Sequence, residues 1–303
     1  MKKLMLIVNP NAGKGGYKAG LGEALQIFYS AGYLPSVYFT AAPGDATKLA
    51  IDHARGYDLI VCMGGDGTLS ETTAGLAQLT DAPELGYIPM GTANDVAASL
   101  GLSKNPAEAA QTVVTGRGMD MDLGLFNDNR YFTYIAAFGA FTDVSYITPQ
   151  QSKQALGHFA YVLEGMKALP KLPTTHAVVE YDGGTIDGDF IFGGVTNSTS
   201  LAGLIRLDSS LVELGDGLFE VILVRTPKNI IDLQTAFSEF VNKDYSGTQI
   251  TILHSSSIRF RFPEPMAWTR DGENGGEHSE VCLKNLRHAV KIRVSPGRFF
   301  ANE

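Results

Sequence analysis

A glycine-rich loop carries the residues of this chain that are best suited to phosphate chemistry. The loop is Gly64-Gly65-Asp66-Gly67-Thr68; it follows the apolar run Leu59–Met63 and precedes a helical pattern. Glycine lets backbone approach a ligand closely, and free N–H groups at a helix N-terminus bind phosphate. A carboxylate there would repel phosphate unless a cation lay between them, so Asp66 suggests Mg²⁺. We also expect Thr68 to be the N-cap of the helix and Glu71 to complete a capping box. The alternative to a phosphate-binding loop is a tight turn with a helix cap and no ligand.

A second loop of the same kind is Pro89-Met90-Gly91-Thr92-Ala93-Asn94-Asp95, which follows the apolar run Gly86–Ile88. Asp95 could hold a metal or an acceptor hydroxyl, although taken alone it would be an acid that complements a helix dipole. In a parallel sheet both loops would lie at the carboxyl ends of strands, where ligands bind.

The third loop, Asn9-Pro10-Asn11-Ala12-Gly13-Lys14-Gly15-Gly16, is similar to a Walker A loop but does not complete it. Lys14 is followed by glycines, where the motif has Ser or Thr. A G-x-G-x-x-G pattern is also absent from this loop, so a Rossmann dinucleotide fingerprint is unsupported. Three glycine-rich loops on one sheet edge are nevertheless unlikely to be coincidental.

The elements that must position these loops alternate between strand and helix over the first ~120 residues. This rhythm predicts βαβ units with right-handed crossovers around a parallel sheet. The expected strands are Leu4–Val8, Val37–Thr40, Leu59–Met63 and Gly86–Ile88. The expected helices are Lys18–Ala31, Ala46–Ala54, Thr68–Leu79, Ala93–Leu100 and Pro106–Thr115.

After Gly118 the chain is rich in short strands separated by turn residues, which predicts a β-sandwich-like second domain. The expected strands are Asp120–Leu125, Arg130–Phe138, Thr175–Tyr181, Thr185–Val195, Leu218–Val224, Gln249–Leu253, Ile258–Phe262, Val281–Leu283 and Ala289–Val294. Two helices, Gln151–Leu169 and Lys228–Asn242, interrupt them. We therefore expect a nucleotide-binding α/β domain over 1–120 and a β-sandwich over 121–288, with the strand at 289–303 returning to the first domain.

Composition excludes several other classes of protein. Lys and Arg total 24 and Asp and Glu total 32, so 24 − 32 gives a formal net charge of −8, which argues against nucleic acid as a partner. Two cysteines without a Cys-x-x-Cys pair argue against a zinc site or a disulfide framework and fit a reducing compartment. The apolar run at the start is shorter than a signal peptide needs, and no window is long enough for a membrane helix. We expect a cytoplasmic protein.

Five motif regions together resemble the soluble bacterial diacylglycerol kinase family, which is related to sphingosine and ceramide kinases. They are Asn9-Pro10-x-Ala12-Gly13, Gly64-Gly65-Asp66-Gly67-Thr68 with Glu71, Gly91-Thr92-x-Asn94-Asp95, Leu211-Val212-Glu213-Leu214-Gly215-Asp216-Gly217-Leu218 and Asp271-Gly272-Glu273. Their order and spacing match along nearly the whole chain. The Gly-Gly-Asp-Gly element alone is shared with NAD kinases and phosphofructokinases. The resemblance implies a three-layer α/β domain like that of those two enzymes, followed by a β-sandwich.

The resemblance implies a kinase that uses ATP and Mg²⁺ to phosphorylate a lipid hydroxyl. The residues that would line the nucleotide site are Asn9, Pro10, Ala12, Gly13, Thr40, Gly64, Gly65, Asp66, Gly67, Thr68, Ser70, Glu71, Gly91, Thr92 and Asn94. Asp66 and Asp95 would organise the catalytic Mg²⁺, and Asp271 or Glu273 would be the general base. Asp216 would hold a structural Mg²⁺ with the backbone carbonyls of Glu213 and Leu218.

The chemistry is consistent with these residue types. Phosphoryl transfer depends on positioning and charge neutralisation, and an alcohol is a weak nucleophile that benefits from a nearby carboxylate. Asp271 and Glu273 are two residues apart, so in an extended segment their side chains would share a face; the sequence leaves open which is the base. An exposed acidic turn is the alternative for this segment.

Two positions depart from the family pattern. Ser70 stands where the family usually has Asn, and Gly215 stands where a second Asp is common. The first puts local nucleotide contacts in doubt, and the second weakens the structural metal assignment.

The partner expected from the resemblance is a lipid substrate at the membrane surface, with transient, peripheral contact at the inner face of the membrane and no nucleic acid. A homodimer is one of the assemblies left open. Two other functions compete: a kinase of a soluble acceptor such as NAD or a sugar phosphate, and a regulator that binds nucleotide without catalysis. The first leaves the late acidic segments unexplained, and the retained acids Asp66, Asp95, Asp271 and Glu273 argue against the second.

Overall fold

The computed structural model describes residues 1–15, 17–139, 174–201, 205–206, 212–242, 245 and 247–296 of the chain. These residues fall into two compact units. The first unit comprises Met1–Leu123 and the chain from Arg287 onward, and the second lies between Gly124 and Leu286. The chain therefore passes from one unit to the other twice, once within β5 (Arg117–Phe126) and once within β15 (Glu273–Val294).

The sheet of the first unit is parallel. Its order is β15-β4-β3-β1-β2, with β1 at Lys2–Val8, β2 at Tyr33–Phe39, β3 at Leu59–Gly64 and β4 at Glu84–Pro89. β1 pairs in parallel with both β2 and β3, and β3 pairs in parallel with β4. Burial on both faces explains why β3 reads as a continuous apolar run rather than as an alternating one.

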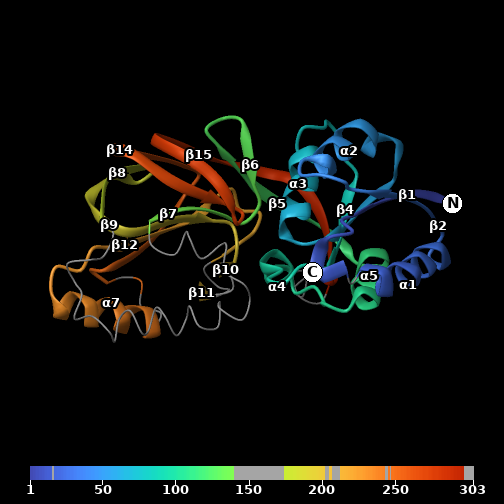
Figure 1. Ribbon diagram of the computed structural model, residues 1–303, viewed down its shortest axis with the longest axis horizontal. Helices are drawn as coiled ribbons and strands as arrows, with labels where there is room; N and C mark the ends of the chain where they lie inside the picture. Colours follow the sequence, from blue (N-terminus) through green and yellow to red (C-terminus); the bar gives the residue numbers. More distant parts are fainter. Residues whose placement is uncertain are drawn as a thin grey trace. The chain divides into compact units, whose positions relative to one another are not determined.

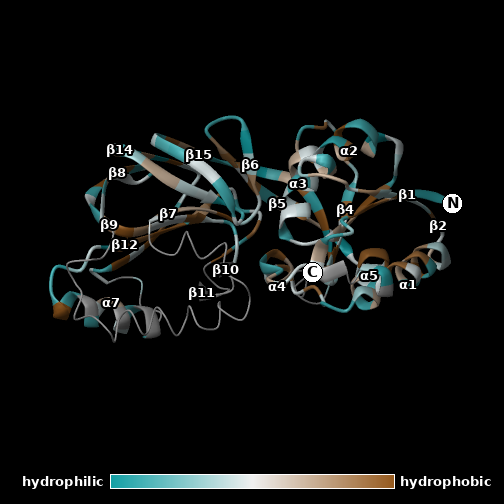
Figure 2. Cartoon of the chain, in the orientation of Figure 1, coloured by the Kyte–Doolittle hydropathy of each residue, from teal (hydrophilic) through white to brown (hydrophobic). Residues whose placement is uncertain are grey.

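Helices cover both faces of this sheet, with α1 and α5 on one side and α2 and α3 on the other (Figure 1). Their bounds are α1 Tyr17–Ser30, α2 Asp45–His53, α3 Asp66–Leu76, α4 Asp95–Leu100 and α5 Pro106–Thr115, with short 3₁₀ turns at Ala12–Gly15 (η1) and Ala54–Gly56 (η2). One core forms where Ala24 and Phe28 of α1 and Ala109, Ala110 and Val113 of α5 meet the sheet. The apolar colour of the central strands in Figure 2 follows from this burial.

The predicted elements of the first unit all exist, but several boundaries shift. α3 begins two residues before the predicted Thr68, and α4 begins two residues after the predicted Ala93. Strand β2 begins four residues before the predicted Val37, because it pairs with β1 along its whole length. Strand pairing and loop packing, which a local pattern does not contain, set these limits.

The second unit is built from antiparallel strands in the order β13-β12-β9-β7-β14-β15, with β8 paired to β9 and β14, and β6 paired to β5. Their bounds are β6 Arg130–Phe132, β7 Ile135–Gly139, β8 Thr175–Tyr181, β9 Gly184–Thr196, β12 Phe219–Arg225, β13 Ile250–Ser255 and β14 Ser257–Arg270. A short pair, β10 (Ser200–Leu201) and β11 (Ile205–Arg206), and the helix α7 (Ile230–Asn242) complete the described part of this unit.

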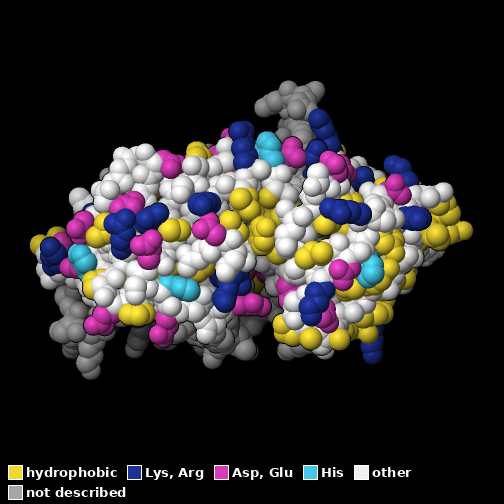
Figure 3. Space-filling model, turned by 90° about the horizontal axis from the view of Figure 1, so that it is seen from above, with side chains coloured by type: hydrophobic (Ala, Val, Ile, Leu, Met, Phe, Trp, Pro, Cys, Tyr) yellow, Lys and Arg dark blue, Asp and Glu magenta, His cyan; other side chains and the backbone are white. Residues whose placement is uncertain are grey.

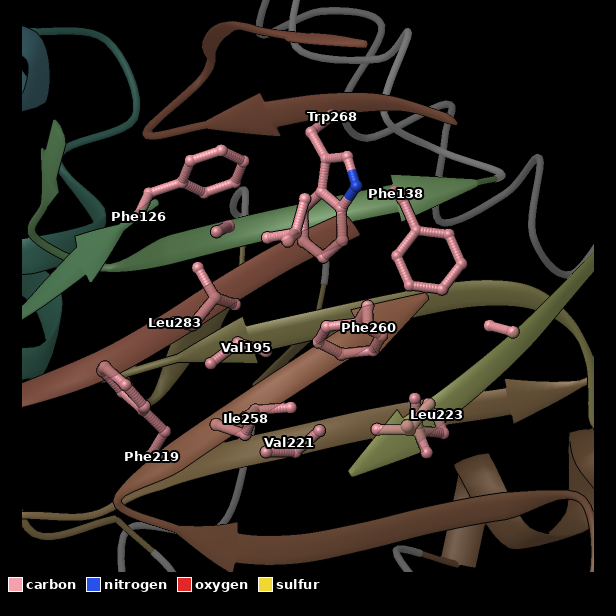
Figure 4. Packing of buried hydrophobic residues seen from close by; sticks show 14 of the residues in the cluster. Phe126, Phe138, Val195, Phe219, Val221, Leu223, Ile258, Phe260, Trp268 and Leu283 are labelled. Carbon is pink, nitrogen blue, oxygen red and sulfur yellow. The ribbon is translucent and has the colours of Figure 1, made fainter. Parts of the chain in front are cut away.

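Aromatic side chains dominate the core of the second unit (Figure 4). The ring of Trp268 lies 5.1 Å from that of Phe138 and 5.2 Å from that of Phe260, centroid to centroid. Edge-to-face and tilted pairs of this kind add about 0.5–1.5 kcal/mol each beyond the burial of their area. Trp268 lies near the end of β14, so this packing fixes the strand that leads into the Asp271 turn.

Several strand predictions for the second unit are wrong in detail. The predicted strand Arg130–Phe138 is two strands, because Thr133 and Tyr134 form a connection between β6 and β7. Val281–Leu283 and Ala289–Val294 are parts of the single long strand β15. The predicted helix Gln151–Leu169 lies outside the described residues.

Charge and hydropathy add two observations. Figure 3 shows acidic and basic side chains interspersed on one face of the molecule. Within the described part of the chain, none of the helices combines the length and the apolar character that crossing a bilayer requires.

Candidate active site

The loops that follow β1, β2, β3 and β4 meet at the carboxyl edge of the first unit's sheet, as predicted for the three that follow β1, β3 and β4. Hydrogen bonds between backbone groups join each loop to its neighbour. The N–H of Asn9 donates to the Met63 carbonyl (3.0 Å), that of Thr40 to the Val8 carbonyl (3.0 Å), and that of Met90 to the Gly64 carbonyl (2.7 Å). Parallel pairing thus places four segments from distant parts of the sequence side by side.

Every residue predicted to line the nucleotide site lies in these loops or in the first turns of the elements that follow them. Pro10, Ala12 and Gly13 follow β1, Thr40 follows β2, Gly64–Glu71 spans the end of β3 and the start of α3, and Gly91–Asn94 follows β4. The structure brings this set together within one unit.

Glycine allows the loops to touch. Gly65 and Gly91 pack backbone against backbone, and a Cβ atom on Gly91 would lie 2.7 Å from the Gly65 Cα. Gly13 adopts a φ of +56°, and a Cβ there would overlap the Met90 carbonyl. Side chains at these positions would force the loops apart, so glycine is a packing requirement here as well as a means of approaching a ligand.

Asn9 fixes the loop after β1 to the loop after β3. Its Nδ2 donates to Thr68 Oγ1 (2.9 Å), and its Oδ1 accepts the Asn11 N–H (2.9 Å). Thr68 is buried, so this bond ties the end of β1 to the first turn of α3.

The predicted capping box is wrong. The N-cap of α3 is Gly65, which is extended (φ −87°, ψ −176°), so the helix begins before Thr68. Glu71 instead accepts the N–H groups of Gly44 (2.7 Å) and Ala46 (3.2 Å) at the start of α2. Glu71 therefore caps a neighbouring helix, which fixes the segment that follows Thr40.

Two carboxylates lie at the centre of the site. Asp66 accepts hydrogen bonds from the N–H groups of Asp95 (3.2 Å) and Val96 (3.4 Å) at the first turn of α4. Asn94 makes this possible: it adopts the left-handed conformation, and its side chain bonds both the N–H and the carbonyl of Gly91 (2.9 and 2.8 Å). Asp95 itself is only 3% exposed.

The electrostatics of this pair are unfavourable for two free carboxylates. Burial, with the negative charge of Asp95 as the second cause, raises the pKa of Asp66 to about 6, although the backbone hydrogen bonds act in the opposite direction. A divalent cation would offset this repulsion, and carboxylate oxygens are its preferred ligands. The residues present therefore fit Mg²⁺ held by Asp66 and Asp95.

The predicted base residues lie in the second unit and differ from each other. Asp271 is buried (8% exposed), and its carboxylate accepts the N–H groups of Thr133 (2.7 Å), Tyr134 (3.0 Å) and Ile135 (3.1 Å). Glu273 is exposed at the start of β15. The expectation that the two side chains share a face is wrong, because Asp271 lies in a turn with a φ of +48° and not in an extended segment.

The segment predicted to hold a structural metal is a turn before β12. Asp216 is half-buried, and its Oδ1 accepts the Leu218 N–H (2.8 Å); Gly217 has a φ of +89°. Glu213 is exposed. The segment offers the carboxylate of Asp216, already engaged in the turn, the exposed carboxylate of Glu213, and backbone carbonyls.

Three contacts of the candidate residues were not expected from the sequence. They are the close approach of Gly13 to the Met90 carbonyl, the capping of α2 by Glu71, and the binding of three successive amides by Asp271. Of these, only the contact of Asp271 has a sequence feature that points to it, because Asp-Gly between two strand patterns is typical of a tight hairpin turn.

Comparisons with known proteins agree with this geometry. Residues 3–126 match the model of the diacylglycerol kinase catalytic domain. A diacylglycerol kinase of Bacillus subtilis (strain 168) is 36% identical over 292 residues, covering 95% of both sequences. The chain belongs to the diacylglycerol kinase family. It is therefore an enzyme of the lipid kinase class.

Other members of the family and solved structures support the assignment. A diacylglycerol kinase of Staphylococcus aureus (strain MRSA252) is 39% identical over 292 residues, covering 95% of this chain and 91% of its own. A crystal structure described as a diacylglycerol kinase from Bacillus anthracis str. Sterne superposes with a TM-score of 0.77 at 25% identity. A second structure from that strain superposes with a TM-score of 0.81 at 28% identity, and both alignments cover 98% of each chain.

The contact between the two glycine loops generates a first prediction. Gly91→Ala should weaken ATP binding at least tenfold and destabilise the fold by about 1–3 kcal/mol, because the new methyl group has no room. Titration of ATP and thermal unfolding measure the two effects.

The matched control is Gly22→Ala, in the middle of α1, where a Cβ atom would meet nothing within 4 Å. That variant should be stabilised by about 0.5–1 kcal/mol and should bind ATP normally. Normal ATP binding by Gly91→Ala would show that the close approach of the loops is not needed for the nucleotide.

The raised pKa of Asp66 generates a second prediction, which concerns stability. Because the folded-state pKa of about 6 exceeds the usual 3.8, stability contributed by the protonated form is complete below pH ~4 and is lost as the pH rises through ~6. Asp66→Asn imitates the protonated form, so without Mg²⁺ it should be more stable than the parent chain by about 1–2 kcal/mol at pH 7.5, allowing for a weakened hydrogen bond. Thermal melts from pH 4.5 to 8 should show the difference shrinking toward acid; an equal difference at every pH would contradict the assignment.

Proposed function

We propose that this chain transfers the γ-phosphoryl group of ATP to the hydroxyl of diacylglycerol or a related membrane lipid, in a reaction that requires Mg²⁺ and gives phosphatidic acid or its equivalent. The observation that carries the proposal is the Asp66–Asp95 carboxylate pair at the carboxyl edge of the parallel sheet, where the glycine loops pack against each other. Membership of the diacylglycerol kinase family supports the lipid acceptor. The finer likeness of the first unit to phosphofructokinases and NAD kinases, and of the second to a β-sandwich, is part of the same proposal.

The glycine loops would bind the phosphates of ATP. Their backbone N–H groups and the first turn of α3 present donors to anionic oxygens, and no side chain at Gly65 or Gly91 stands in the way. Asp66 and Asp95 would hold Mg²⁺, which when bound neutralises charge on the phosphates. Asn9 and Thr68 would keep the loops aligned through their mutual hydrogen bond.

We assign the general base to Glu273 rather than to Asp271. A base needs a carboxylate that can reach the acceptor hydroxyl. Three backbone amides already occupy the carboxylate of Asp271, whereas Glu273 is exposed. Glu273 would accept the hydroxyl proton as the oxygen attacks the γ-phosphorus, and ADP would leave.

The structural Mg²⁺ site of Asp216, Glu213 and Leu218 stays a proposal that the resemblance supports. Transient contact of a cytoplasmic enzyme with the inner membrane face follows from a lipid acceptor, since such a substrate must be taken from a bilayer. The net charge of −8 argues against nucleic acid as a partner. A homodimer is compatible with the proposal but not required by it.

The decisive experiment measures phosphate transfer from labelled ATP to lipids in mixed micelles. The panel contains diacylglycerol, monoacylglycerol, phosphatidylglycerol, sphingosine and ceramide, with NAD and fructose 6-phosphate as soluble controls. We expect a labelled lipid that depends on added Mg²⁺, and we expect Asp66→Ala to lose transfer by at least 10³-fold while remaining folded. Label in NAD or the sugar phosphate alone would replace the proposal with a soluble acceptor, and near-normal transfer by Asp66→Ala would refute the site.

The assignment of the base has its own test. Glu273→Gln should lower kcat by about 10²–10⁴-fold, the usual contribution of a general base, and leave the affinity for ATP within twofold. Steady-state kinetics and ATP titration separate the two quantities. A loss confined to ATP affinity would move Glu273 from proton transfer to nucleotide binding.

A further inference from the structure

The role of Asp271 is not explained by the assignment of the base to Glu273. Asp271 and Gly272 are the two residues of the turn between β14 and β15, since Arg270 pairs with Glu273 on either side of them. Both turn residues have a positive φ, +48° and +80°, which is the requirement of a tight type I′ hairpin. Asn-Gly meets that requirement equally well, so the turn itself does not need a carboxylate.

The carboxylate of Asp271 binds a second segment of the chain. It accepts the amides of Thr133 and Tyr134, which connect β6 to β7, and of Ile135, the first residue of β7; the Asp271 N–H donates to the Ile135 carbonyl (2.9 Å). We call these four hydrogen bonds the amide clamp. A buried carboxylate is costly unless such donors replace water, and hydrogen bonds to a charged group are stronger than those between neutral groups.

The amide clamp acts immediately beside Glu273. Glu273 is the residue immediately after the turn and the first residue of β15, so the orientation of the turn determines the position of the Glu273 Cα atom. Arg270, its pairing partner, is held from strand β6, just before that connection, because its Nη1 donates to the Tyr131 carbonyl (3.1 Å). Asp271 and Arg270 are thus held by residues 131–135, and Glu273 is tied to them through its pairing with Arg270.

We propose that Asp271 is a positioning residue that acts through Glu273, and that the amide clamp holds the turn so that the Glu273 carboxylate meets the lipid hydroxyl. This inference rests on the proposed function. Displacement of a reacting group by about 1 Å can lower a rate about 10²-fold, so loosening the clamp should reduce kcat with little effect on ATP binding.

The test is a double-mutant cycle in kcat with Asp271→Asn and Glu273→Gln. Asn keeps the positive-φ turn but removes the charge and replaces one acceptor oxygen with a donor. We expect Asp271→Asn to lower kcat about 10–100-fold in the parent chain, and less than threefold when Glu273 is already Gln. The KM for ATP should change less than twofold.

Glu239→Gln is the matched control. Glu239 is also buried in the second unit, and it accepts the successive amides of Thr248, Gln249 and Ile250 at the start of β13. Glu239→Gln should lower the melting temperature about as much as Asp271→Asn does, but it should leave kcat within twofold of the parent value. Both variants are assayed well below their melting temperatures.

The outcomes separate the alternatives. If Asp271→Asn lowers kcat by the same factor in the parent chain and in Glu273→Gln, the role of Asp271 is structural and does not act through Glu273. If Asp271→Asn leaves kcat unchanged, Asp271 has no role in the reaction. A parent-like kcat for Glu273→Gln beside an inactive Asp271→Asn would make Asp271 the base. If the parent chain phosphorylates no lipid, the proposed function fails; the cycle is then run on whichever acceptor takes the phosphate, and amide exchange at residues 133–135 in Asp271→Asn still tests the clamp.

Discussion

The parallel pairing of β1, β3 and β4 is the constraint from which the site in the first unit follows. Parallel strands end at the same sheet edge, so the loops after them must share a small space. In this chain the loops are close enough that Gly65 and Gly91 touch through their backbones. The N–H groups at the start of α4 then reach the Asp66 carboxylate, and the two acids come together at the place where a cation and phosphates would bind.

The buried carboxylates of this protein illustrate two uses of the same group. Asp66 lies beside a second acid, and its pKa is raised by burial and by that charge. Asp271 and Glu239 each accept three successive backbone amides, which is the arrangement expected of a carboxylate that organises the chain. Asp66 accepts backbone amides as well, so what marks it as a candidate ligand-binding acid is the negative charge of Asp95 beside it.

The sequence was sufficient for the loops and the order of the elements in the first unit, because glycine runs and apolar runs are local signals. It misplaced the start of α3 and the partner of Glu71, since the cap of a helix depends on which backbone donors the fold brings near. It left Asp271 and Glu273 equivalent, because two acids separated by one glycine look alike until the turn orients them. The sequence also did not predict that the strand expected over Arg130–Phe138 is interrupted at Thr133 and Tyr134. The amides of these two residues bind Asp271, a contact that depends on the fold.

The position of β15 in the sequence has a consequence for synthesis of the chain. Its last residues belong to the first unit, where Ile292 lies opposite Leu85 of β4 and Arg293 donates to Glu84 (2.7 Å) and to the Val113 carbonyl (2.9 Å). A ribosome therefore delivers the whole second unit before β4, already paired with β3, acquires β15 as its second neighbour. Until then one edge of the nascent sheet is uncovered, and such an edge can pair with another chain. Release of the chain before β15 is made would leave that edge of β4 unpaired.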